Sequence, residues 1–173
     1  MAAVKANKTD GQGLGKALDA IGTVIIVLAI ILCLGLAIPK FLGITSFTVL
    51  TGSMEPTIPV GSLVMAKYTE PVTLQSGDIV VFYDGVDSLP ITHRLVTNDT
   101  DKGLITTQGD ANDAPDPMVT PYQNILGKVL IHIPFVGRLL APLSSFIGKL
   151  SLVAIILGAL LLSMAGKRAM RRA

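Results

Sequence analysis

The sequence predicts a mainly β exported domain flanked by two transmembrane α-helices. Half of the 173 residues are hydrophobic and only 15% are charged, a balance unlike that of a simple soluble domain. Most of the excess lies in two apolar segments, residues 20–38 and 146–165. Between them, short runs of β-branched and aromatic residues alternate with Gly, Pro and Asp, a pattern typical of strands and turns. These observations place a β domain between two membrane anchors.

The first anchor is expected at residues 20–38, which are 19 consecutive residues without a charge. This is close to the ~20 residues that a helix needs to span the hydrocarbon core. A cleavable secretory signal is the alternative, because a basic leader precedes the segment and Gly35-Leu36-Ala37 offers small residues for a cut. The apolar run is longer than the usual signal core of ~7–15 residues, so a spanning helix is favoured.

The second anchor is expected at residues 146–165. Lys149 is its only charged residue, and a long side chain of this kind can extend its ammonium to the membrane interface. Residues 138–145, which precede it and are mostly apolar, are expected to form a membrane-proximal connector.

Charge placement predicts the orientation. The tails, residues 1–19 and 166–173, hold seven basic and two acidic residues, whereas residues 39–149 hold seven basic and ten acidic residues. Basic flanks stay on the cytoplasmic side of a membrane. We therefore expect a multi-pass protein of the cell membrane with both termini in the cytoplasm and the middle outside. The basic tails would then contact lipid headgroups, and no nucleic-acid partner is expected.

The exported domain is expected at residues 39–137, which is large enough for one hydrophobic core. Pro39 and Gly43 are expected to break the first helix. Strands are then predicted at 44–50, 62–66, 79–83, 91–96, 104–107 and 125–133.

Serine, histidine and aspartate follow one another along this domain. Ser53 comes just after the first predicted strand, and His93 lies within the fourth. An acidic loop at residues 109–116 then contains Asp110, Asp113 and Asp116. Because a serine hydroxyl needs a base to become a nucleophile, this set of side chains is the one that acyl-transfer chemistry often uses.

Each of these features also has a purely structural interpretation. A serine beside Gly and Pro often caps a turn, and the acidic loop could be an exposed turn or a Ca²⁺ site. The loop lacks the glycine and the terminal glutamate of an EF-hand, so no metal is expected. His132, inside an apolar run, is left out of the site, and Cys33 has no second cysteine with which to pair.

Four sequence boxes resemble, in order, those of type I signal peptidases. They are Thr-Gly-Ser-Met-Glu-Pro-Thr at 51–57, Gly-Asp-Ile-Val-Val-Phe at 77–82, Thr-His-Arg-Leu-Val at 92–96 and Gly-Asp-Ala-Asn-Asp-Ala-Pro-Asp at 109–116. Histidine instead of lysine in the third box resembles the endoplasmic-reticulum/SipW-like branch, which includes the catalytic subunit of the eukaryotic signal peptidase complex. The likeness covers about residues 49–136.

The resemblance implies a mainly β exported peptidase domain and a membrane-anchored signal peptidase I. Such a serine endopeptidase cleaves signal peptides from exported preproteins after small residues at −3 and −1, and it needs no cofactor. Ser53 would be the nucleophile, His93 the general base and Asp116 its partner, while Asp110 would support the catalytic loop. Which of the two aspartates dominates stays open at this point. Thr51 and the backbone N–H of Ser53 would form the oxyanion hole.

The substrate is expected to pair with exposed strands beside the nucleophile. The residues predicted to bind it are Phe47, Val49, Leu50, Ile91 and Thr92. Expected partners are secretory preproteins and the lipid bilayer, and accessory membrane subunits are left open. Two alternative interpretations are a non-catalytic membrane module and a member of the self-cleaving repressor class. The repressor class has a DNA-binding helical domain and a lysine base, neither of which is found in this sequence.

Overall fold

The computed structural model describes residues 2–85 and 88–172. Met1 and Ala173, the outermost residues of the two predicted tails, lie outside the described residues. The chain divides into two compact units. One unit, which we call the helix pair, contains Met1–Ala37 and Leu143–Ala173, and the other, which we call the β domain, contains Ile38–Pro142.

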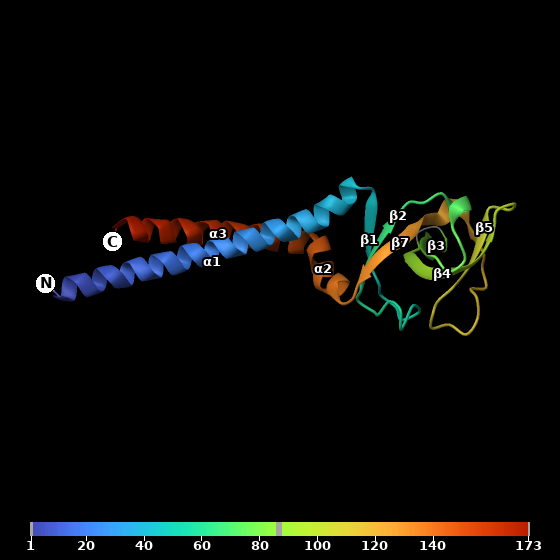
Figure 1. Cartoon of the computed structure of the whole chain (residues 1–173), viewed down its shortest axis with the longest axis horizontal. Helices are drawn as coiled ribbons and strands as arrows, with labels where there is room; N and C mark the ends of the chain where they lie inside the picture. Colours follow the sequence, from blue (N-terminus) through green and yellow to red (C-terminus); the bar gives the residue numbers. More distant parts are fainter. Residues whose placement is uncertain (1, 86–87, 173) are drawn as a thin grey trace. The chain divides into compact units, whose positions relative to one another are not determined.

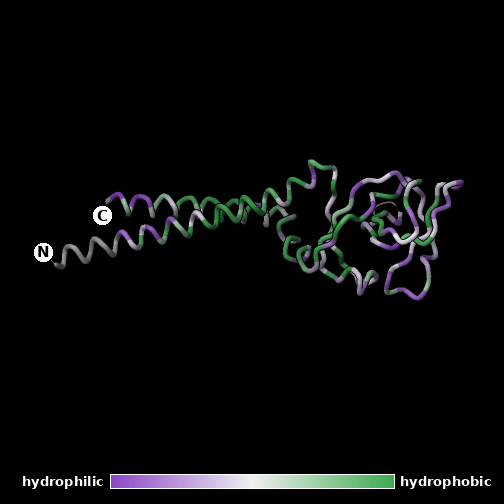
Figure 2. Tube along the Cα trace, in the orientation of Figure 1, coloured by the Kyte–Doolittle hydropathy of each residue, from purple (hydrophilic) through white to green (hydrophobic). Residues whose placement is uncertain are grey.

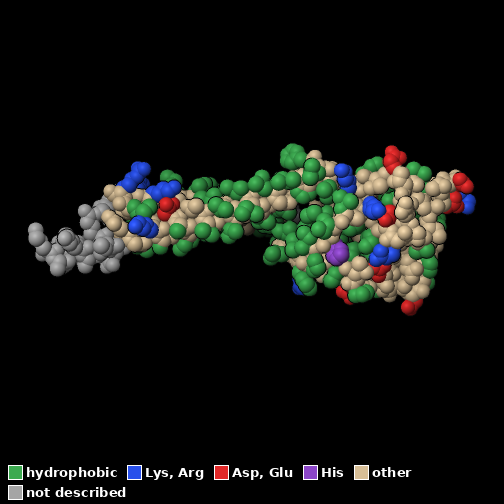
Figure 3. All heavy atoms as spheres, viewed as in Figure 1, with side chains coloured by type: hydrophobic (Ala, Val, Ile, Leu, Met, Phe, Trp, Pro, Cys, Tyr) green, Lys and Arg blue, Asp and Glu red, His purple; other side chains and the backbone are tan. Residues whose placement is uncertain are grey.

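The helix pair consists of α1 (Ala2–Phe41) and α3 (Phe146–Arg172), which run side by side with both chain ends at the same end of the pair (Figure 1). Both helices are long and apolar enough to cross a membrane, over Gln12–Phe41 and Phe146–Arg171. Figure 2 shows hydrophobic residues along the middle of the pair and hydrophilic residues toward the chain ends. In Figure 3 the visible face of the helices carries many apolar side chains, and basic side chains gather near the chain ends.

Small residues let α1 and α3 approach closely. A Cβ atom added at Gly22 would lie 2.6 Å from the backbone oxygen of Ala159, so only glycine fits there without a shift. One turn away, the Ser163 hydroxyl donates a hydrogen bond of 2.5 Å to Asp19, and the Lys167 ammonium lies 3.8 Å from the same carboxylate. Small residues at the contact and a polar bond across it are typical of helix packing in membranes.

The C-terminal end of α1 differs from the expectation. Pro39 was predicted to break the helix, but it lies inside α1, which continues to Phe41. The helix ends at Phe41, just before Gly43, the other predicted breaker, whose φ of 72° is a left-handed conformation that favours glycine. Proline removes one backbone donor, whereas the reversal of the backbone at Gly43 stops the helix.

The β domain is built on a sheet of seven antiparallel strands among the described residues, in the order β1-β2-β7-β3-β4-β5-β6. The strands are β1 (Ile44–Thr48), β2 (Leu63–Lys67), β3 (Ile79–Tyr83), β4 (Pro90–Asp99), β5 (Leu104–Gln108), β6 (Thr120–Pro121) and β7 (Ile125–Ile133). This architecture and the two apolar helices confirm the predicted fold class.

Both faces of the sheet are buried at its centre, on β3. Val80 and Phe82 face one apolar cluster with Leu95, while Val81 between them faces a second cluster with Met54. The alternation follows from the two-residue period of a strand. Because β3 is buried on both faces and pairs with β4, it fixes the position of β4, the strand that carries His93.

The structure adds elements that the sequence pattern did not reveal. These are the two-residue strand β6, the 3₁₀-helices η1 (Pro71–Thr73) and η2 (Tyr122–Asn124), and the short helix α2 (Val136–Ser144) over most of the predicted connector. Arg138 at the start of α2 donates its backbone N–H to the Gly61 carbonyl at 2.9 Å, which attaches α2 to the turn before β2.

Candidate active site

Ser53 lies in a series of turns that follows β1. Its neighbours Met54 and Ile58 are fully buried in the core, and the Ile58 N–H donates to the Met54 carbonyl at 2.8 Å. The Ser53 carbonyl accepts a hydrogen bond of 2.9 Å from the N–H of Ala111 in the acidic loop. Core packing and this bond therefore hold the serine backbone in place, while its side chain lines a surface pocket.

His93 and Asp116 form a hydrogen-bonded pair. His93 Nδ1 and Asp116 Oδ2 are 2.6 Å apart, and both side chains are largely buried. The imidazole also packs edge-on against the ring of Phe82, with centroids 6.3 Å apart. An ionised carboxylate only accepts hydrogen bonds, so a neutral imidazole held in this way has its proton on Nδ1 and a lone pair on Nε2.

Gly109 shows how close the histidine and serine segments are. A Cβ atom at this position would lie 2.6 Å from the Ser53 carbonyl oxygen and 3.0 Å from His93 Nε2. Glycine is required here because any side chain would enter the space between the two. Among the described residues, Ser53 Oγ forms no hydrogen bond with Nε2, and such bonds are often long until substrate binds.

Asp110 has a different partner. Arg94 donates two parallel hydrogen bonds to it, from Nε at 2.8 Å and from an Nη atom at 2.7 Å, and the other Nη atom of Arg94 donates to the Gly77 carbonyl. The Thr57 side chain also acts on Asp110, since it lowers the pKa of this carboxyl. Asp110 therefore connects β4, next to His93, with the segment that follows Ser53.

These bonds change the acidity of Asp110. The hydrogen bonds from Arg94 hold the pKa of this carboxyl below its usual value, against the opposing effect of burial, and the Thr57 hydroxyl lowers it further. Asp110 in turn raises the pKa of Arg94. Both shifts favour the charged forms, so the pair is ionised at neutral pH.

We expect Asp110→Asn to lower the melting temperature of the β domain by about 5–10 °C at pH 7, the equivalent of ~1–2 kcal/mol for a lost charged hydrogen-bond partner. Because the folded pKa lies below the unfolded value of about 3.9, this stability is present above that value and disappears as the pH falls through the folded pKa. The deficit should therefore shrink below about pH 4.

Near-ultraviolet circular dichroism is suited to this measurement, because the three tyrosines lie in the β domain and the chain has no tryptophan. Asp113→Asn, in the same loop and exposed, is the matched control and should melt like the wild type. An Asp110→Asn protein as stable as this control would show that the Arg94 pair contributes nothing.

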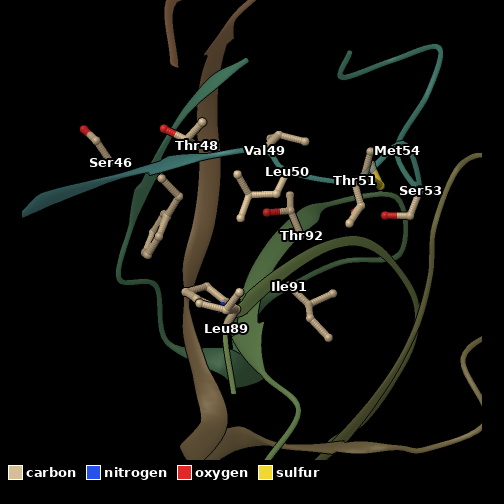
Figure 4. A pocket seen from close by; sticks show the side chains of 12 residues that line it. Ser46, Thr48, Val49, Leu50, Thr51, Ser53, Met54, Leu89, Ile91 and Thr92 are labelled. Carbon is tan, nitrogen blue, oxygen red and sulfur yellow. The ribbon is translucent and has the colours of Figure 1, made fainter. Parts of the chain in front are cut away.

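A pocket of about 400 Å³ opens beside Ser53. Figure 4 shows side chains from the β1 end facing those from the start of β4, with Thr51 and Ser53 at one end. All five residues predicted to bind substrate line it, together with Thr51 and Ser53; the five are Phe47, Val49, Leu50, Ile91 and Thr92. Ser46, Thr48, Met54, Leu89 and Pro90 complete the lining and were not predicted.

Three further predictions from the sequence concern Thr51, His132 and a metal site. Thr51 is exposed at the pocket, and among the described residues its hydroxyl forms no hydrogen bond, so it is open to a bound molecule. His132 lies on β7, opposite Val64 of β2, and does not line this pocket. Within the described part of the chain, no group of three His, Cys, Asp or Glu side chains is arranged to hold a metal ion.

Sequence reasoning missed two side chains that act on the candidate aspartates. Thr57 lowers the pKa of Asp110, and Thr107 on β5 donates a hydrogen bond of 2.6 Å to Asp116. A signal for Thr107 was present, because it is a polar residue in phase with the buried Ile105 of the same strand. Thr57 stands in the serine box, but nothing in the sequence connects it with a particular loop.

Comparison with known proteins shows which family the chain resembles. The family described as signal peptidase, peptidase S26, matches residues 20–105. Signal peptidase I W of Bacillus subtilis is 38% identical over 90 residues, which cover 50% of this chain and 47% of the relative. The signal peptidase complex catalytic subunit of Candida albicans is 31% identical over 99 residues, 51% of this chain and 59% of the relative.

The corresponding subunit of Pyricularia oryzae is 34% identical over 106 residues, which cover 56% of this chain and 62% of the relative. The chain thus spans about half to three fifths of the length of the curated relatives that it matches. Both a SipW-like enzyme and eukaryotic catalytic subunits are among them. The chain belongs to the S26 signal peptidase family, in the endoplasmic-reticulum/SipW-like branch.

Proposed function

We propose that this protein is a membrane-anchored serine endopeptidase, a signal peptidase I, that removes signal peptides from exported preproteins. The observation that carries the proposal is the His93–Asp116 pair, with Nδ1 and Oδ2 2.6 Å apart, beside a pocket that Ser53 lines. A histidine with a fixed tautomer next to a serine is what acyl transfer requires.

In the proposed mechanism, Ser53 Oγ attacks the scissile carbonyl while His93 Nε2 accepts its proton. The tetrahedral intermediate collapses to an acyl-enzyme, and the imidazolium gives the proton to the leaving amine. Water then attacks the acyl-enzyme ester while His93 Nε2 accepts its proton, and the imidazolium returns a proton to Ser53 Oγ as the ester bond breaks. Asp116 stabilises the imidazolium, and Asp110 supports the loop through Arg94.

The oxyanion formed in each attack needs donors that are already in position. The Ser53 N–H and the Thr51 hydroxyl are proposed for this role, because both belong to the segment that carries the nucleophile and Thr51 is exposed at the pocket. Donors that need no rearrangement stabilise the transition state more than the ground state, and loss of one typically costs ~10²–10³ in rate.

Among the described residues, two strand edges beside the pocket have no pairing partner. β1 pairs with β2 on one side only, and residues 90–93 of β4 pair with β3 but precede the part of β4 that pairs with β5, which begins at Arg94. We propose that the substrate adds an extended strand here by backbone hydrogen bonds. Phe47, Val49, Leu50, Ile91 and Thr92 would then surround its side chains and select small residues at −3 and −1.

The domain boundaries are also proposals. Residues 20–38 and 146–165 would span the cell membrane, with 1–19 and 166–173 as cytoplasmic basic tails, 39–137 as the exported peptidase domain and 138–145 as the membrane-proximal connector. The exposed apolar helices and the basic chain ends support this arrangement. The active site would face the extracytoplasmic side, where signal peptides emerge.

Thiol labelling of intact cells tests this orientation. In a Cys33→Ser background, we expect a membrane-impermeant thiol reagent to label Glu70→Cys, which is exposed in the β domain, but not Arg168→Cys near the C-terminus. Both should react once the cells are opened, which controls for accessibility. Labelling of Arg168→Cys alone in intact cells would reverse the topology and remove the exported active site.

The function itself is tested by adding the purified protein in detergent to a preprotein and sequencing the new N-terminus. We expect one cut after small residues at −3 and −1, and no cut in a matched preprotein with bulky residues at these two positions. Since the fungal relatives are named as subunits of a complex, the assay is repeated in membranes from the expressing cells. Cleavage in neither setting would reject the proposed function.

A further inference from the structure

The hydroxyl of Thr107 is bonded to the same carboxylate oxygen as the candidate base. Thr107 Oγ1 donates to Asp116 Oδ2 at 2.6 Å, and His93 Nδ1 reaches that oxygen at 2.6 Å. The backbone connects the same two residues, because the Asp116 N–H donates to the Thr107 carbonyl at 2.8 Å. Thr107 is completely buried.

This double attachment matters because Asp116 does not lie on a regular element. It belongs to the irregular segment between β5, which ends at Gln108, and the two-residue strand β6, which begins at Thr120. Such a segment does not by itself fix a side-chain direction. β5, by contrast, pairs with the strand that carries His93. Thr107 therefore connects a loop aspartate to the sheet that holds its histidine.

The bonding capacities of the three groups fix one arrangement. A threonine hydroxyl has a single proton, and donating it to Asp116 leaves one lone pair of Oδ2 for the imidazole N–H. A carboxylate held at this oxygen cannot rotate away from Nδ1 without breaking both bonds. The Thr107 hydroxyl is thus a second hydrogen-bond donor to the Asp116 carboxylate, whose negative charge stabilises the imidazolium.

We infer that Thr107 is a positioning residue for the peptidase reaction, acting through Asp116 to hold His93 in the tautomer and orientation that leave Nε2 free. The inference rests on the proposed function, in which Ser53, His93 and Asp116 carry out the chemistry. Thr107 does not line the pocket, and its effect passes through the aspartate.

Thr107→Val keeps the shape of the side chain and removes the hydroxyl. We expect kcat for preprotein cleavage to fall by about 10- to 100-fold, the range for one hydrogen bond to a charged group, with KM within about twofold. Thr107→Ser restores the hydroxyl and should keep kcat within about threefold of the wild type, while its melting temperature falls because a buried methyl group is lost. If Thr107 were only structural, kcat would be lower for Thr107→Ser than for Thr107→Val.

Two further variants guard against misfolding. Thr107→Ala lacks the same methyl group as Thr107→Ser, so the difference between these two isolates the hydroxyl even if the valine protein does not fold. Thr106→Val makes the same chemical change on the opposite face of β5 and should leave kcat unchanged. Equal kcat values for the alanine and serine variants would overturn the inference.

A double-mutant cycle separates this inference from the proposed function. Asp116→Asn alone should reduce kcat by about 10⁴, as in a well-studied triad, and Thr107→Val should then add less than about twofold. If the two losses multiply, Thr107 does not act through Asp116 and the inference is wrong. If Asp116→Asn keeps normal kcat, the proposed role of Asp116 fails, and the inference fails with it.

Discussion

Replacement of Ser53 by alanine is expected to abolish preprotein cleavage without altering the fold. The change removes one oxygen from a half-buried side chain, while the buried neighbours Met54 and Ile58 and the bond from Ala111 continue to hold the backbone. Loss of the nucleophile in a triad costs about 10⁶ in kcat, since the remaining groups act as a unit with it. We therefore expect no product within the range of a sensitive peptide assay.

The measurement compares cleavage by the purified variant with that by Ser76→Ala, an exposed serine of the same domain that should cleave like the wild type. Near-ultraviolet circular dichroism confirms that both are folded. Cleavage by the Ser53→Ala protein at the wild-type rate would reject the serine mechanism. It would favour the rival in which this chain is a non-catalytic module that assembles other exported proteins.

The two histidines are expected to behave in opposite ways. His93→Ala should reduce kcat by about 10⁶ as well, because no other group can take the serine proton. His132→Ala should retain most of the activity, since His132 lies on β7 away from the pocket lining. Equal losses from both substitutions would indicate a fold defect instead of a catalytic one.

His93→Lys extends this test to the mechanism of the base. The hydrogen-bonded Asp116 carboxylate would keep a lysine ammonium charged at this position, and a charged amine cannot act as a base. We therefore expect no rescue. Full activity in the lysine protein would show that the base works differently from the proposal, in the manner of the lysine-based rival class.

Several parts of this molecule could be predicted from sequence because their signals are local. The uncharged run at residues 20–38 is long enough to span a membrane whatever surrounds it. Six predicted strands are found close to their expected positions, since β-branched residues between Gly and Pro favour extended backbone. The boxes that contain Ser53, His93 and the acidic loop likewise identified the family before any geometry was known.

Other features depended on groups that are distant in sequence. Asp110 and Asp116 stand six positions apart in one acidic loop, and sequence left open which of them dominates. The sheet brings Arg94 against Asp110 and His93 against Asp116, and these different partners separate the two carboxylates. Local sequence does not determine where a side chain points in an irregular loop. The directions of the Asp110 and Asp116 side chains therefore depend on the pairing of β4 with β5.

The sequence by itself determined the family, the two apolar helices, the mainly β domain and the residue types of the candidate site. Only the tertiary structure decided that Gly109 must lack a side chain, since that position lies between the Ser53 carbonyl and His93 Nε2. It also decided that Thr107 binds Asp116, and that β1 and the start of β4 face one pocket. The reason is physical: propensity and hydropathy act between near neighbours, whereas a catalytic distance is set by strands that meet only when the sheet forms.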